Sequence, residues 1–276
     1  MNKGRFVFQK IAHYGASHPA FARTMMQFLE LQPGLLGRNE KLSECIMECA
    51  QVVVHCGQHV EAAKESVAQS IERFIAERRN GVAALPWAIG IEGHAEQFLF
   101  SAKHCFHSVA KVLATFFHTD QFPLDAKALW PNNDKAAATA WAVSRYGANS
   151  PIATTLQFGE TQIGEILKWR NAAEHKNDPK SKSGVLKIRN FVIVNGKVEE
   201  PKWQRTKEGD EPFIPIIATL EQWQGFILDY AEQIIVVSCH HNLHPSAQIQ
   251  LLPDTKINPD SPFRYRLNFG DFTNAH

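Results

Sequence analysis

The 276-residue sequence lacks the motifs that mark the common nucleotide-binding and hydrolytic folds. It contains no glycine-rich phosphate loop, no Gly-x-Ser-x-Gly nucleophile elbow and no His-Glu-x-x-His zinc motif. It also has no internal repeat and no low-complexity tract. These absences argue against a sheet-based nucleotide fold, a solenoid and a disordered chain.

The chain also has almost no net charge, since 29 basic residues balance 28 acidic ones to leave +1. A general polyelectrolyte binder is therefore unexpected, and any contact with nucleic acid must come from a local cluster. No stretch is apolar enough to span a membrane, and the N-terminal apolar run is too short for a signal peptide. Five cysteines, an odd number, fit a reducing compartment better than a disulfide framework. We expect a cytoplasmic protein that does not enter a membrane.

Helical periodicity dominates what is present, and it predicts a mostly α protein. The longest clean pattern, 92–118, carries an apolar stripe at i,i+3/i+4 spacing. The other predicted helices are two or three within 18–76, one at 135–146, one that ends near 176 and one at 220–242. This pattern divides the chain into an N-terminal helical block and linker (1–90), a helical bundle (91–245) and an extended C-terminal tail (246–276).

A β-hairpin interrupts the bundle before its last helix. Asn195-Gly196 separates two runs rich in β-branched residues, which is a strong hairpin signal. Pro201 lies in the second run, so we expect that strand to be an edge. Thr219 and Gln222 predict a capping box at the start of the last helix.

The best chemical clue is the cluster Arg170, Asn171 and His175 near the end of an amphipathic helix. Arg170 and Glu174 fall on the apolar stripe of that helix. One account is an i,i+4 ion pair between these two residues. The other is a groove that needs a guanidinium, flanked by Asn171 and His175. The five-residue separation of Arg170 and His175 is about 140° around a helix, so one ligand meets both only in a cleft or between two chains.

This cluster resembles the signature of the HEPN (higher eukaryotes and prokaryotes nucleotide-binding) superfamily. That signature is an Arg, four to six residues and then a His, often with a polar residue such as Asn directly after the Arg. The resemblance implies a metal-independent endoribonuclease, often a toxin or defence factor, that acts as a homodimer and can have an antitoxin or another protein partner. It makes Arg170, Asn171 and His175 the candidate catalytic residues and RNA the substrate.

Four further residues are candidates for binding RNA phosphates. Lys103 and His107 lie on the polar side of the 92–118 helix, and Lys168 and Lys176 flank the cluster. Between Lys168 and Arg189 the chain has seven basic residues against two acids. The alternatives are a solvated helix face and a solubilising loop.

No metal and no cofactor is predicted. Cys45, Cys49, His55, Cys56 and His59 resemble a set of metal ligands, but the apolar residues around the thiols favour a core. A second class of function stays open beside the nuclease. This is a non-catalytic helical module that binds RNA, a nucleotide or a protein partner.

Overall fold

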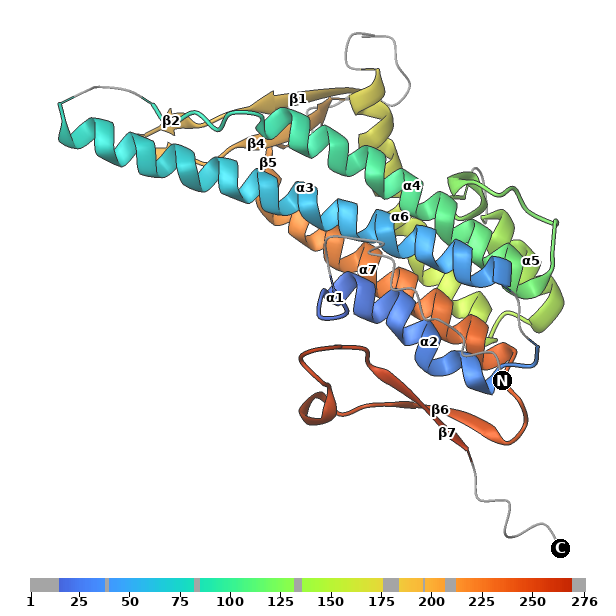
Figure 1. Ribbon diagram of the computed structural model, residues 1–276. Coiled ribbons are helices and arrows are strands. Elements are labelled where there is room, and N and C mark those ends of the chain that lie inside the picture. Colours follow the sequence, from blue (N-terminus) through green and yellow to red (C-terminus); the bar gives the residue numbers. More distant parts are fainter. Residues whose placement is uncertain are drawn as a thin grey trace, which may run out of the picture.

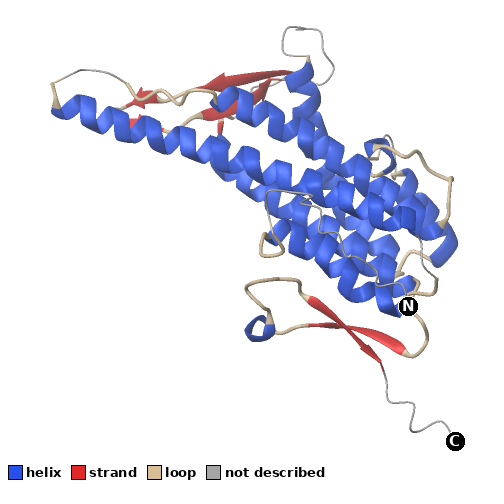
Figure 2. Cartoon of the chain, viewed as in Figure 1, coloured by secondary structure: helices blue, strands red, loops and turns tan. Residues whose placement is uncertain are grey.

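The computed structural model describes residues 15–37, 40–81, 85–131, 136–175, 184–195, 197–206 and 212–269. Of these residues 64% are helical and 14% are in strands, so the prediction of a mostly α protein is confirmed. Long helices form one bundle, and the strands lie in two places at its edges (Figures 1 and 2). In the described residues no helix is both long and apolar enough to cross a membrane.

The bundle consists of α3 (Glu40–Arg79), α4 (Ile91–Phe117), α5 (Ala137–Tyr146), α6 (Pro151–Glu174) and α7 (Ile216–His241). Before it, the chain forms one nearly continuous helical stretch of α1 (Pro19–Phe21), the π-helical η1 (Ala22–Met26), α2 (Gln27–Leu31) and the 3-10 helix η2 (Gln32–Gly34). Two further 3-10 helices are η3 (Ala126–Ala128) and η4 (Asp254–Lys256). The predicted helix 92–118 is confirmed as α4.

A single hydrophobic core runs through the bundle from Ala20 to Cys239. α3 contributes buried residues at helical spacing, such as Ile46, Cys49 and Val53, and packs along α4. The N-terminal helical block therefore shares its core with the bundle, and the expected boundary near residue 90 falls between two helices that pack together.

Close packing also positions α6, the helix that carries the candidate site. The hydroxyl of Ser150 caps its first turn, and Pro151 occupies the first helical position. At Gly159 an added Cβ would overlap the ring of Tyr230 on α7. The glycine thus lets these two helices approach closely.

Five short strands follow α6: β1 (Val185–Arg189), β2 (Val192–Val194), β3 (Lys197–Glu199), β4 (Lys202–Thr206) and β5 (Ile214–Pro215). The predicted hairpin is confirmed, because β2 pairs antiparallel with β3 across a turn where Asn195 has a left-handed φ of 51°. Gly196 lies outside the described residues. The expected second strand divides at Pro201. Its first part is β3, an edge of the two-stranded sheet β2-β3, whereas the residues after Pro201 begin β4, the central strand of the antiparallel sheet β1-β4-β5.

Two expectations near the C-terminus are also corrected. α7 begins at Ile216, so Thr219 lies inside its first turn and donates to the Pro215 carbonyl at 2.6 Å instead of forming the predicted cap. The tail is not simply extended, because β6 (Ala247–Leu251) and β7 (Tyr265–Phe269) form a hairpin below α2 (Figure 1). Gln27 of α2 holds this hairpin through three hydrogen bonds to backbone groups of residues 264 and 265, at 2.7 to 3.0 Å.

Candidate functional site

The last two turns of α6 carry the cluster predicted from the sequence. Buried apolar residues, among them Ile166, Leu167 and Ala173, hold this part of the helix against the core. Trp169 packs against Trp203 of β4, with ring centroids 4.8 Å apart. Both the bundle and the sheet therefore fix the end of α6.

Arg170 forms the i,i+4 pair with Glu174 that one of the two accounts predicted. Arg170 Nη2 donates to Glu174 Oε1 at 2.9 Å, and Nη1 donates to the other carboxylate oxygen, so the contact is bidentate. Nη1 also donates to Asn171 Oδ1 at 3.1 Å, and the guanidinium carbon lies 5.2 Å from the centroid of the Phe100 ring. The Arg170 side chain is only 10% exposed, against 43% for Glu174. Glu174 thus neutralises the charge of Arg170 on the buried packing face of α6.

His175 ends α6 and faces solvent, with 51% of its side chain exposed. Its Nε2 lies 3.9 Å from Glu174 Oε2, the oxygen that Arg170 Nη1 also contacts. Arg170 and His175 therefore converge on one carboxylate within a single chain. A cationic side chain, a carboxylate and a solvent-exposed imidazole meet at this helix end.

Lys103 approaches this cluster from α4, and His107 lies one turn further along that helix. Phe100, Lys103 and His107 follow one another at i,i+3 and i,i+4 spacing, so they share a face of that helix. Burial, and then the positive charge of Arg170, lower the pKa of Lys103. Burial also lowers the pKa of His107. The charge of Asp125 raises this pKa, and the charge of Lys103 lowers it. The electrostatic influence of Arg170 on Lys103 puts the two cations in one neighbourhood.

Lys168 is not part of this arrangement. Two residues before Arg170, it points about 200° away around the helix. Its Nζ lies 3.8 Å from Glu165, on the side where Glu165, Trp169 and Trp223 line a cleft of about 560 Å³. Lys176, the other flanking lysine, lies outside the described residues.

The sheet that follows displays further positive charge. Strand register places Leu186, Ile188 and Trp203 on the face of β1 and β4 that is more buried. Lys187, Arg189 and Lys202 alternate with them and occupy the other face. The basic character predicted for this region therefore continues onto one face of the sheet.

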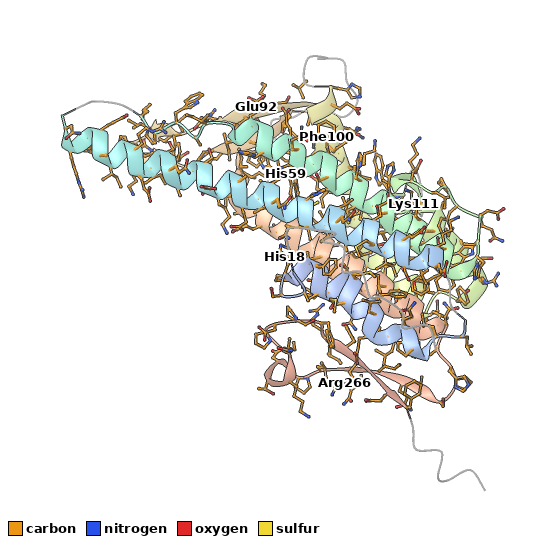
Figure 3. The ribbon with its side chains drawn as sticks, in the orientation of Figure 1. His18, His59, Glu92, Phe100, Lys111 and Arg266 are labelled. Atoms are coloured by element: carbon orange, nitrogen blue, oxygen red, sulfur yellow. The ribbon has the colours of Figure 1, made fainter. Side chains whose placement is uncertain are left out.

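Phe100 is the residue that the sequence reasoning missed. Phe100 lies on α4 (Figure 3), and its aromatic ring is 5.2 Å from the guanidinium carbon of Arg170, a contact that favours a cation. The signal was its spacing of three residues from Lys103 on the same helix. An aromatic residue on an otherwise polar face can be recognised in a sequence, but its partner on another helix cannot.

Four of the five cysteines are buried in the core, and Cys45 is partly buried beside it. Cys49, Cys56 and Cys105 are buried between α3 and α4, and burial raises the pKa of the Cys56 thiol far above its ordinary value. Within the ranges described above, no group of three or more His, Cys, Asp or Glu side chains could hold a metal ion.

No protein-family model, no curated protein and no solved structure matches this chain. The resemblance to the HEPN superfamily therefore rests on Arg170, Asn171 and His175 and on their helical surroundings.

Proposed function

We propose that the chain is a metal-independent endoribonuclease of HEPN type, with its active centre at the end of α6. One observation carries this proposal: Arg170, Asn171, Glu174 and His175 form a connected cluster in which the imidazole faces solvent. Lys103 lies close enough for Arg170 to lower its pKa, which adds a second cation for a phosphate. RNA fits this set because its cleavage needs only proton transfer and charge stabilisation.

In the proposed reaction, the ribose 2′-hydroxyl loses its proton and its oxygen attacks the neighbouring phosphorus. The bond from phosphorus to the 5′-oxygen breaks, and that oxygen takes up a proton. The products are a 2′,3′-cyclic phosphate and a 5′-hydroxyl. His175 acts as the acid or base because its ring is exposed at the cluster. DNA cannot react in this way, since it lacks the 2′-hydroxyl.

Arg170 binds the phosphate after Glu174 has released its guanidinium. The half-exposed carboxylate can turn toward water, which releases Nη1 and Nη2 for two parallel hydrogen bonds to phosphate oxygens. Asn171 then holds the guanidinium from the side through its Oδ1. An incoming phosphate and Glu174 compete for the same donors.

A second candidate function is a non-catalytic helical module that binds RNA, a nucleotide or a protein. The observation in its favour is that both terminal nitrogens of Arg170 are already engaged by Glu174 and the side chain is buried. In this case the pair stabilises the fold, and the basic face formed by Lys187, Arg189 and Lys202 makes the contact with an anionic partner.

The nuclease assignment also includes a homodimer, a cytoplasmic location and an antitoxin or other protein partner. All five cysteines are free thiols, which supports a reducing compartment. Because Arg170 and His175 meet at Glu174 within one chain, a second copy is not required to bring these two side chains together.

The test is cleavage of end-labelled RNA by the purified protein in excess EDTA. We expect RNA products with a 2′,3′-cyclic phosphate and a 5′-hydroxyl, and no cleavage of DNA of the same sequence. His175→Ala should lower the rate by about 10² to 10⁴, the usual contribution of a general acid or base. His240→Ala is the matched control, because His240 is also an exposed histidine in the last turn of a helix.

The control variant should cleave at the wild-type rate. Equal rates for His175→Ala and wild type would end the catalytic proposal. Binding of uncleaved RNA by the same samples would then support the second candidate.

A further inference from the structure

The C-terminal end of α3 extends beyond the bundle (Figure 1). Buried residues are frequent in the first part of this helix, from Leu42 to Ala63, and after them only Ser70 is buried. We call residues 68–81 the α3 arm. A helix end without its own core needs another reason to stay helical, because short isolated helices are marginal in water.

One side of the α3 arm is covered by its own chain. The Ser66 hydroxyl donates to the Ile89 carbonyl at 2.6 Å, just before the arm begins. The side chain of Asn190 holds the backbone of Ala88 through two hydrogen bonds of 3.0 Å. The segment before α4 is thereby fixed along the side of α3 that carries Ser66.

The opposite side carries an exposed apolar stripe. Ile75 is nine residues after Ser66, or about 180° away around the helix. Ile71 and Ile75 are 39% and 45% exposed, and Ala68 continues their stripe at i,i+3/i+4 spacing. The neighbouring isoleucines form an apolar surface on a projecting helix that another protein can cover.

Charges border the stripe in a self-complementary order. Glu72 precedes Ile75 by three residues and Arg79 follows it by four, so both lie on the same side of the stripe, about 20° apart. Both are exposed. Among the described residues, neither forms an ion pair. Along the helix axis, the acidic charge of Glu72 therefore comes before Ile75 and the basic charge of Arg79 comes after it.

We propose that the α3 arm pairs with the α3 arm of a second copy of this chain in antiparallel orientation. A two-fold axis near Ile75 brings this residue against the partner's Ile75. Glu72 lies about 4.5 Å before Ile75 along the helix and Arg79 about 6 Å after it, so Glu72 meets the partner's Arg79. Symmetry makes this contact twice.

The charge order selects a second copy over an unrelated partner. An antiparallel copy neutralises both exposed charges and buries the isoleucines with no other chain required. This inference concerns a surface away from the α6 cluster, and it holds whether or not the chain cleaves RNA.

A charge-swap experiment on the full chain tests the pairing by sedimentation velocity over a concentration series. The wild type should show a dimer that dissociates on dilution. Glu72→Arg places Arg against the partner's Arg79, and Arg79→Glu places Glu against the partner's Glu72. Each single variant creates two like-charge contacts and should weaken dimerisation by at least about tenfold.

Two further samples test the antiparallel orientation, a double variant and a mixture of the two single variants. The double variant Glu72→Arg/Arg79→Glu should recover dimerisation to within about threefold of the wild type, because both pairs re-form with their signs exchanged. Mixing the two single variants should yield a heterodimer in which every facing pair is opposite in charge. A wild type that stays monomeric overturns the proposal, and so does a double variant no better than the singles.

The same samples separate this inference from the proposed nuclease. The fold of each variant is checked by circular dichroism, and RNA cleavage is measured in parallel. A monomeric wild type that cleaves RNA refutes the arm pairing and the homodimer, and it leaves the proposed RNA cleavage standing. A dimer that follows the charge swaps but does not cleave RNA refutes only the nuclease.

Discussion

Replacing Glu174 alone should destabilise the protein more than replacing Glu174 and Arg170 together. The guanidinium is 10% exposed and the carboxylate is 43% exposed. Without Glu174, the buried guanidinium keeps its hydrogen bond to Asn171 and its contact with the Phe100 ring. Without Arg170, water can still reach the carboxylate. Removing Glu174 should therefore lower the free energy of unfolding more than removing Arg170.

The size of the effect follows from this inequality. Breaking a fully buried pair costs about 3–5 kcal/mol, whereas an exposed pair contributes about 0.2–1 kcal/mol. For a pair with one buried member, we expect Glu174→Ala to lower the free energy of unfolding by about 2 kcal/mol. Arg170→Met removes the charge but keeps an apolar stem of similar length, so it should change this free energy by less than about 1 kcal/mol.

The double variant Arg170→Met/Glu174→Ala should then be more stable than Glu174→Ala, by about 1–2 kcal/mol. Equilibrium unfolding in urea, followed by circular dichroism, gives the four free energies. Equal m values across the set would show that the same surface is exposed on unfolding. Glu61→Ala is the matched control, because Glu61 pairs with Lys64 on the surface, where the Glu61 side chain is 73% exposed. This control should cost less than about 0.5 kcal/mol.

Two results would refute the reasoning. One is a cost for Glu174→Ala no larger than for the Glu61→Ala control, which would mean that water hydrates Arg170. The other is a double variant that is less stable than Glu174→Ala, which would mean that the guanidinium stabilises the fold mainly through contacts other than the pair.

The remaining predictions concern the C-terminal hairpin and pH. Arg264→Ala should lower the free energy of unfolding by about 1.5–3 kcal/mol, because Arg264 Nε donates at 3.0 Å to the fully buried carboxylate of Glu232, which then keeps Arg23 as its cationic partner. A melting temperature equal to that of the wild type would contradict this. Stability should fall as pH drops from 7 to 5, because burial lowers the pKa of His241 and His59 below 6.5, so the unfolded chain binds more protons in this window. His241→Phe should flatten this slope in urea titrations at several pH values, and an unchanged slope would count against the role of His241.

Local patterns in the sequence determined several features of this protein. The period of 3.6 residues placed α4 within one residue at each end, and Asn195 marked the turn between β2 and β3. The spacing of Arg170 and Glu174 indicated their ion pair. These features depend on residues at most a few turns apart, and the geometry of a helix or a tight turn fixes such distances almost without help from the rest of the chain.

Only the tertiary structure decided which residues from distant parts of the chain contact these elements. Phe100 meets Arg170 because α4 and α6 pack together, and β4 is a central strand because β5 pairs on its far side, which Pro201 could not reveal. The C-terminal hairpin folds back onto the bundle through Gln27, a residue more than 230 positions away. Contacts of this kind depend on how whole helices and strands pack, and a pattern read along the chain contains only the order of its residues.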